Sequence, residues 1–217
     1  MDDKIFFMAL IIFDFDGVLA DTLDDLLQFG QEACDELGVE HIVKKDDLSN
    51  LEVMSFAAYG RACEVPDHLV DEFVKRCLKR FAGKKSPPAI FNGMGNIVRR
   101  LAVNNTIAII TTNSSQNVNA FLVEHGLDGY VHAVYGVDSP GSKAQKISIA
   151  RNRLLAETKQ ESVFMVGDSL SDIRAAKETA TTSIAVTWGH QSLEHLLGGD
   201  PDYIVNFPCE LIEIIEK

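Results

Sequence analysis

The sequence has few cysteines, and no two of them form a C-x-x-C pair. They are spread over apolar or helical stretches, at Cys34, Cys63, Cys77 and Cys209. Because the number of cysteines is even, a disulfide between two of them stays possible. A domain of roughly 200 residues with its own core, however, needs no covalent link. We therefore expect reduced, partly buried thiols.

The N-terminal stretch MDDKIFFMALIIFDF lacks the features of a signal peptide or a membrane span. Its apolar run is short, follows acidic residues and ends at Asp14, whereas a signal peptide has a basic start and a small-residue cleavage site. A membrane-spanning helix takes about 20 apolar residues. We expect a β-strand here, in a cytoplasmic protein with no membrane partner.

Positive charge is also scarce, with 20 Lys and Arg residues against 32 Asp and Glu residues and a formal net charge of −12. An acidic surface repels phosphodiester backbones, so we expect no nucleic-acid partner. A small anionic substrate remains open, because local lysines and a bound cation can override the net field. The locally basic stretch 75–85 could attract such a substrate, although a solvated helix face explains it more simply.

Short apolar runs rich in β-branched residues alternate with helical patterns over most of the chain, which is 46% hydrophobic and 24% charged. The candidate strands are 8–15, 106–112, 131–137, 162–168, 182–188 and 202–207. Apolar strands without polar alternation, separated by helices, are typical of a parallel sheet with helices on both faces. The expected fold class is α/β, with a Rossmann-like parallel sheet core.

The stretch from 19 to 87 differs, because it has no convincing strand and three or four amphipathic helical patterns. A Gly- and Pro-containing segment follows it and returns the chain to the core. We predict an inserted α-helical cap domain over 19–87 and a catalytic core formed by 1–18 and 88–217.

Acids, hydroxyls and a lysine stand where the candidate strands end. They are Asp14, Asp16, Thr111, Thr112, Asn113, Asp168 and Asp172, with Lys143 at the start of a helix. In an open parallel sheet, ligands bind at the carboxyl ends of the strands. This set of side chains therefore predicts a phosphoryl-transfer site with a hard cation.

The expected roles follow from the chemistry of each group. Adjacent carboxylates raise one another's pKa unless a cation lies between them, and Mg²⁺ prefers oxygen ligands such as Asp14, Asp168 and Asp172. Asp14 could attack phosphorus to form an aspartyl-phosphate, while Asp16 protonates the leaving alcohol and later takes a proton from water.

The transferring phosphoryl group needs its own contacts. Lys143 and the Thr111 hydroxyl would stabilise its equatorial oxygens. The absence of a side chain at Gly17 would let backbone amides approach the phosphate. We also expect Thr112 and Asn113 to line the substrate position.

These residues resemble the haloacid dehalogenase-like hydrolase superfamily, in its phosphoglycolate phosphatase-like branch with a small helical cap. DFDGVLADT is similar to the first motif of that family, IAIITTNS to the second, Lys143 in GSKAQKI to the third and GDSLSDIRAAK to the fourth. The resemblance implies Asp14 as nucleophile and metal ligand, and Asp16 as acid/base and as ligand through its backbone carbonyl. An acid at position 16 argues for phosphate esters over dehalogenation.

Some positions have competing interpretations. Lys146 is an alternative to Lys143, and Asp172 could be an ordinary acid at a helix N-terminus. Ala180 stands where the family often has Gly, which we attribute to packing. Trp188 is expected in the core or cap packing. The histidines show no ligand spacing, and we expect surface or turn positions for His41, His68, His125, His132, His190 and His195.

The sequence thus predicts a Mg²⁺-dependent phosphoric monoester hydrolase that acts on a small phosphorylated metabolite. A phosphomutase of the same fold and a non-catalytic binding module are the alternatives. Phosphoglycolate, a sugar phosphate, a nucleotide monophosphate or a pyridoxal-type phosphate would each suit the core chemistry. The sequence leaves monomer or dimer undecided.

Overall fold

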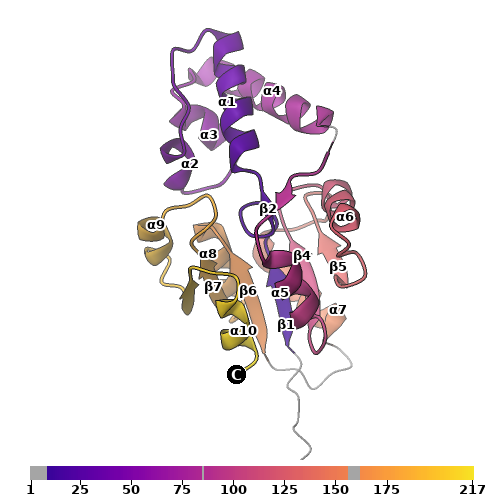
Figure 1. Cartoon of the computed structure of the whole chain (residues 1–217). Helices are drawn as coiled ribbons and strands as arrows, with labels where there is room; N and C mark the ends of the chain where they lie inside the picture. Colours follow the sequence, from indigo (N-terminus) through magenta and orange to yellow (C-terminus); the bar gives the residue numbers. More distant parts are fainter. Residues whose placement is uncertain (1–8, 85, 156–161) are drawn as a thin grey trace, which may run out of the picture.

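The centre of the molecule is a six-stranded parallel sheet (Figure 1). The computed structural model describes residues 9–84, 86–155 and 162–217. The strand order is β5-β4-β1-β6-β7-β8. The strands are β1 Leu10–Phe13, β4 Thr106–Ile110, β5 Ala133–Tyr135, β6 Val163–Gly167, β7 Thr182–Val186 and β8 Tyr203–Val205. The predicted α/β class with a Rossmann-like sheet is confirmed.

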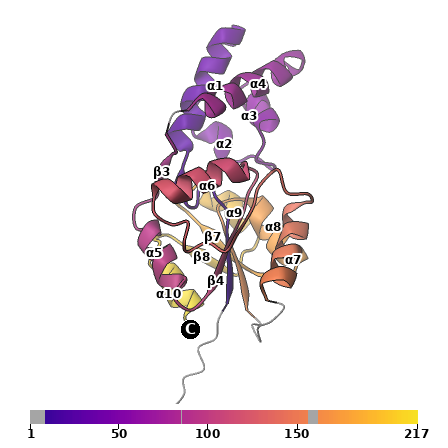
Figure 2. The same ribbon diagram turned by 90° about the vertical axis from the view of Figure 1, so that its right-hand side faces the viewer.

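Helices cover both faces of this sheet (Figure 2). In β1, Ile11 and Phe13 face the cluster of α5, α6 and α10, whereas Leu10 and Ile12 face the cluster of α7 and α8. All four side chains are fully buried. These helices are α5 Met94–Leu101, α6 Ser115–Glu124, α7 Lys143–Leu154, α8 Leu170–Glu178 and α10 Glu210–Ile215, and the short α9 is Leu193–Leu197. A strand buried on both sides explains the unbroken apolar run.

Helices α1 to α4 form a separate layer above the carboxyl ends of the sheet, here called the helical module (Leu23–Gly83) (Figure 1). It comprises α1 Leu23–Leu37, α2 Asp46–Ser49, α3 Phe56–Ala62, the 3₁₀ turn Asp67–Leu69 and α4 Val70–Gly83. The module has its own apolar cluster, which includes Tyr59, Phe73 and Cys77. Whether it is a domain with the boundaries 19 and 87 stays a prediction.

The helical module joins the core through a small antiparallel pair. Strand β2 (Ala20–Asp21) pairs with β3 (Ala89–Ile90). The expectation that no strand lies between 19 and 87 is therefore wrong for β2. Two residues are too short to show a strand pattern, and only the pairing with a segment about seventy positions away defines them.

The observed strands are shorter than the predicted ones. β1 ends at Phe13 rather than at residue 15. The Asp14 backbone N–H still bonds to the Val166 carbonyl of β6 at 2.9 Å, so Asp14 stands at the last rung of the ladder and Asp16 beyond it. Residue 8 of the first predicted strand and Lys85 of the predicted cap lie outside the described residues. Among the described residues, no helix is long and apolar enough to cross a membrane. All four cysteines are free, as expected.

Candidate active site

Three carboxylates meet at the carboxyl edge of the sheet. Asp14 follows β1, Asp168 follows β6, and Asp172 lies in the first turn of α8. All three residues are buried, and their carboxylate oxygens lie within 4.8 Å of one another. The neighbouring strands β1 and β6 are paired in register, which brings residues 100 positions and more apart together.

Lys143 is the cation that faces this cluster. Its Nζ lies 2.9 Å from Asp14 Oδ2 and 2.5 Å from Asp172 Oδ1. Lys143 is the first residue of α7, whose N-terminus is fixed by a reciprocal capping box between Ser142 and Gln145. The alternative, Lys146, points away and donates to the carbonyl of Gly136 at 2.7 Å. The structure therefore brings Lys143, and not Lys146, to the carboxylates.

The electrostatics of the cluster are unbalanced, because one lysine faces three buried acids. Burial raises the pKa of Asp14 to about 8, and the charges of Asp172 and Asp168 add to this against the opposing charge of Lys143. Burial and the Asp172 charge raise the pKa of Asp168 to about 7. Burial alone would lower the pKa of Lys143, but the Asp14 and Asp172 charges outweigh it and raise that pKa.

This donor set fits a hard divalent cation. Each of the three groups offers carboxylate oxygen, the ligand that Mg²⁺ prefers, and a cation would favour the ionised forms that burial opposes. Asp172 has a second function, since its Oδ2 accepts hydrogen bonds from the backbone and hydroxyl of Ser169 at the start of α8. It is thus both a helix-capping acid and a partner of Lys143.

Asp16 lies apart from Lys143 and has its own set of partners. Its carboxylate accepts a hydrogen bond from Asn113 Nδ2 at 3.1 Å. Burial raises the pKa of Asp16, while the Asn113 hydrogen bond lowers it. Asn113 therefore belongs to the site as a partner of Asp16.

The two threonines of the second motif have different surroundings. Thr111 is 2% exposed, and its hydroxyl accepts a hydrogen bond from the Asn113 backbone at 3.0 Å. Thr112 is exposed and, within the described ranges, makes no side-chain hydrogen bond to the cluster. Successive residues beyond a strand point to opposite sides, so only one of the two can face the carboxylates.

Gly17 permits the close approach of the two aspartate-bearing loops. Its φ is +79°, and a Cβ placed there would lie 2.0 Å from Asp168 Oδ2 and 2.9 Å from His190 Nδ1. Both the left-handed backbone and the lack of space favour glycine. Its role is thus to admit Asp168 beside the first-motif turn.

His190 is a site residue that the sequence did not indicate. It lies in a bend after β7 and is 3% exposed, so the expected surface position is wrong, whereas the turn position holds. Its backbone donates to Asp168 Oδ2 at 2.8 Å, and its Nε2 lies 3.3 Å from the Thr22 hydroxyl. Burial lowers the pKa of His190. The sequence feature that could have identified it is its position just after β7, at the same edge of the sheet as the aspartates.

The segment after His190 also connects the core to the helical module. Gln191 accepts a hydrogen bond from the backbone of Leu170 at 2.8 Å and donates to the Leu51 carbonyl at 2.7 Å. The Ser192 backbone donates to the carbonyl of Ser49 at 3.0 Å. One loop therefore contacts both the carboxylate cluster and the module above it.

Residues 11–186 match the family model of the haloacid dehalogenase-like hydrolases. The chain belongs to this family. The phosphoglycolate phosphatase of Synechococcus elongatus is 25% identical over 213 residues, which cover 97% of this chain and 98% of that protein. The phosphoglycolate phosphatase of Vibrio cholerae is 27% identical over 226 residues, covering 96% and 97%.

The fold of this haloacid dehalogenase-like hydrolase is shared by solved structures. A haloacid dehalogenase-like family hydrolase from Streptococcus pneumoniae superimposes with a TM-score of 0.81 at 22% identity, covering 95% of this chain and 98% of that one. The resemblance seen in the four motifs, including that to the phosphoglycolate phosphatase-like branch, is confirmed. The expected enzyme class, a phosphatase, is confirmed with it.

Proposed function

We propose that this phosphatase hydrolyses a small phosphomonoester through an aspartyl-phosphate on Asp14, with Mg²⁺ as cofactor. The observation that carries the proposal is that Asp14 and Asp16, two residues apart in the sequence, have different surroundings. Asp14 faces Lys143 and the carboxylate cluster, whereas Asp16 is held by Asn113. Two environments for two carboxyl groups are what a nucleophile and a proton carrier require.

In the first half-reaction, a carboxylate oxygen of Asp14 attacks phosphorus and the bond to the leaving alcohol oxygen breaks. Lys143 and the Thr111 hydroxyl stabilise the negative charge on the transferring group. Asp14, Asp168 and Asp172, with the Asp16 backbone carbonyl, would hold Mg²⁺, which supplies charge neutralisation when bound.

Asp16 handles the proton in both half-reactions. Its raised pKa favours the protonated form needed to give a proton to the leaving alkoxide. The resulting carboxylate then takes a proton from the water that attacks the aspartyl-phosphate, which releases inorganic phosphate and restores Asp14.

The proposed substrate is a small phosphorylated metabolite, and phosphoglycolate is the first candidate because relatives over nearly the full length are phosphoglycolate phosphatases. The helical module above the site would exclude water and select the leaving group. A cytoplasmic location is part of the proposal, since four free thiols suit a reducing compartment.

The decisive experiment measures phosphate release from phosphoglycolate and a panel of small phosphomonoesters, with Mg²⁺ and with EDTA. We expect metal-dependent turnover that Asp14→Asn lowers by roughly 10³-fold or more. Asp16→Asn should also lower kcat, because this residue handles the proton in both half-reactions.

Thr112→Ala is the matched control, because Thr112 is exposed and lacks a hydrogen bond to the cluster. Its activity should equal that of the wild type. Full activity in EDTA or in Asp14→Asn would contradict the mechanism. Conversion of a sugar phosphate to its isomer without phosphate release would identify a phosphomutase instead.

A further inference from the structure

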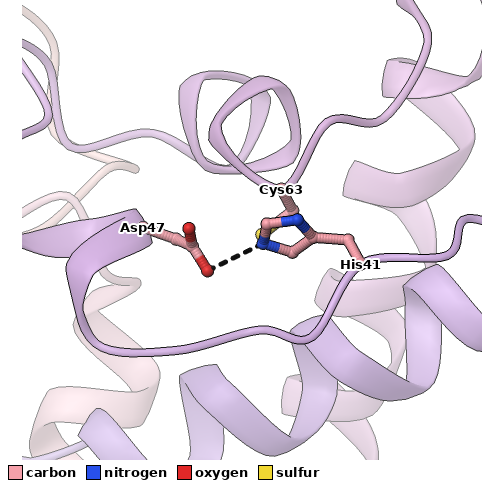
Figure 3. Close-up of side chains that lie close together, drawn as sticks. All are labelled: His41, Asp47 and Cys63. Carbon is pink, nitrogen blue, oxygen red and sulfur yellow. Dashed lines mark hydrogen bonds and ion pairs between the residues drawn. The ribbon is translucent and has the colours of Figure 1, made fainter.

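A second group of potential metal ligands lies inside the helical module, away from the carboxylate cluster. His41, Asp47 and Cys63 point toward one another (Figure 3). One ligand atom of each lies within 4.8 Å of the others. The three come from different segments: the loop after α1, the helix α2 and the residue that ends α3.

The Asp47 carboxylate is only partly used by the protein. Its Oδ2 lies 3.0 Å from His41 Nε2 and accepts the Lys44 backbone N–H at 2.8 Å. Its Oδ1 has no hydrogen-bond partner within the described ranges, although the side chain is only 8% exposed. A buried carboxylate oxygen without a partner is costly and calls for a further ligand.

The Cys63 thiol is fully buried in the apolar cluster of the helical module. Burial and the neighbouring Cys34 and Asp47 charges raise the pKa of this thiol. A cation held by the three side chains would oppose that rise, because it favours the thiolate. The three ligand atoms lie close enough together to share one ion.

We propose that His41, Asp47 and Cys63 form a zinc site in the helical module. One imidazole, one carboxylate and one thiolate are ligands that Zn²⁺ accepts, and three protein ligands leave the fourth tetrahedral position to water. The catalytic cluster offers only oxygen, so the two sites differ in metal preference. Binding would release the Cys63 thiol proton, and the metal with its three protein ligands would then carry no net charge.

The metal would fix the part of the helical module that touches the core. It ties the loop after α1 and the end of α3 to α2. Directly after Asp47, the carbonyls of Ser49 and Leu51 accept hydrogen bonds from the core loop at Ser192 and Gln191. The site therefore supports the surface on which the module meets the active-site loop.

The test titrates Co²⁺ into the full chain after chelator treatment and records the absorption spectrum. Thiolate ligation gives a sulfur-to-metal charge-transfer band that oxygen-ligated Co²⁺ lacks. We expect this band to saturate at one equivalent, to be displaced by Zn²⁺, and to persist in Asp168→Asn, which lacks a carboxylate of the catalytic cluster.

Cys63→Ser should abolish the band and weaken Zn²⁺ binding by roughly 100-fold or more, since losing a direct ligand exceeds the outer-shell effect. Cys77→Ser is the matched control. Cys77 is equally buried in the same module but donates to the Phe29 carbonyl. It should keep the band.

If Cys63→Ser does not fold, the measurements on the wild type decide. A band at one equivalent, with a higher Tm on adding Zn²⁺, supports the site. No band in the folded wild type, or a band that survives Cys63→Ser, overturns it. Phosphatase activity with Mg²⁺ is measured in parallel, so failure of the zinc site and failure of the proposed function are separate results.

Discussion

At the scale of single residues, the carboxyl groups of Asp14 and Asp168 oppose folding when no cation is bound. Both are buried, and among the described residues Lys143 is the one lysine or arginine paired with the cluster. Their pKa values, about 8 and about 7, lie well above the 3.8 of a free aspartate. The site is thus prepared for a cation at the expense of the stability of the metal-free protein.

This gives a pH dependence with a definite sign. In EDTA, the free energy of unfolding should fall as pH rises from about 4 toward about 8, because the unfolded chain releases protons that folded Asp14 and Asp168 retain. Saturating Mg²⁺ should flatten the profile by favouring the ionised carboxylates. Urea unfolding midpoints across this pH range, with EDTA and with Mg²⁺, measure both.

Asp168→Asn isolates one of these groups. The difference in unfolding free energy between wild type and variant in EDTA should change mainly between pH 4 and pH 7, the interval over which Asp168 titrates differently in the two states. A difference that stays constant over this interval would contradict the assigned cause.

Ala180 offers a second prediction at this scale. Its φ is +49°, the left-handed region, so the Gly usual in the family at this position reflects backbone conformation and not packing as expected. Ala180→Gly should stabilise the protein by about 0.5–1 kcal/mol. The substitution relieves the backbone strain of the folded state, and the greater conformational entropy of the unfolded chain offsets part of that gain. Thermal or urea unfolding measures the change, and a lower stability would refute it.

At the scale of elements, helix α8 is held at its N-terminus from two sides. Its own Asp172 and Ser169 form a capping box, and Gln191 accepts the otherwise free backbone N–H of Leu170. The other end of the Gln191 amide reaches the Leu51 carbonyl in the helical module. One buried side chain therefore links the helix that carries Asp172 to the layer above the site.

Gln191→Ala should lower the free energy of unfolding by about 1–3 kcal/mol, because two buried backbone groups lose their partner. KM should rise as the module docks less firmly, with a smaller change in kcat. Ser192→Ala is the comparison variant: it keeps the backbone contact to Ser49 but loses the hydroxyl hydrogen bond to Asn50 and the cap of α9. Equal effects of the two substitutions would argue against a specific role for the Gln191 amide.

The elements also show what the sequence could and could not predict. Buried parallel strands have unbroken apolar runs, so all six strands and the aspartates that follow them were predictable. β2 and His190 were not. β2 is two residues long, and His190 acquires its role only by meeting Thr22, 168 positions earlier in the chain. Contacts between distant loops leave no local pattern.

At the scale of the whole molecule, the net charge of −12 opposes the approach of a phosphate ester. With Mg²⁺ saturating, kcat/KM for an anionic phosphomonoester should rise severalfold as ionic strength increases from about 0.01 M to about 0.15 M, where the Debye length shrinks from about 30 Å to about 8 Å. A decrease would show instead that Lys143 and neighbouring cations dominate the local field.

The β2–β3 pair makes the helical module a loop whose two ends meet. Ala20 pairs with Ile90 and Asp21 with Ala89, so the chain leaves and re-enters the core at one point. An insertion of this kind can be lengthened, trimmed or exchanged without re-threading the sheet. The β2–β3 pair thus marks the two positions at which the helical module joins the core. Exchange of the module at these positions would change substrate preference without changing the phosphoryl chemistry of the core. A module from a relative could be grafted at the same positions.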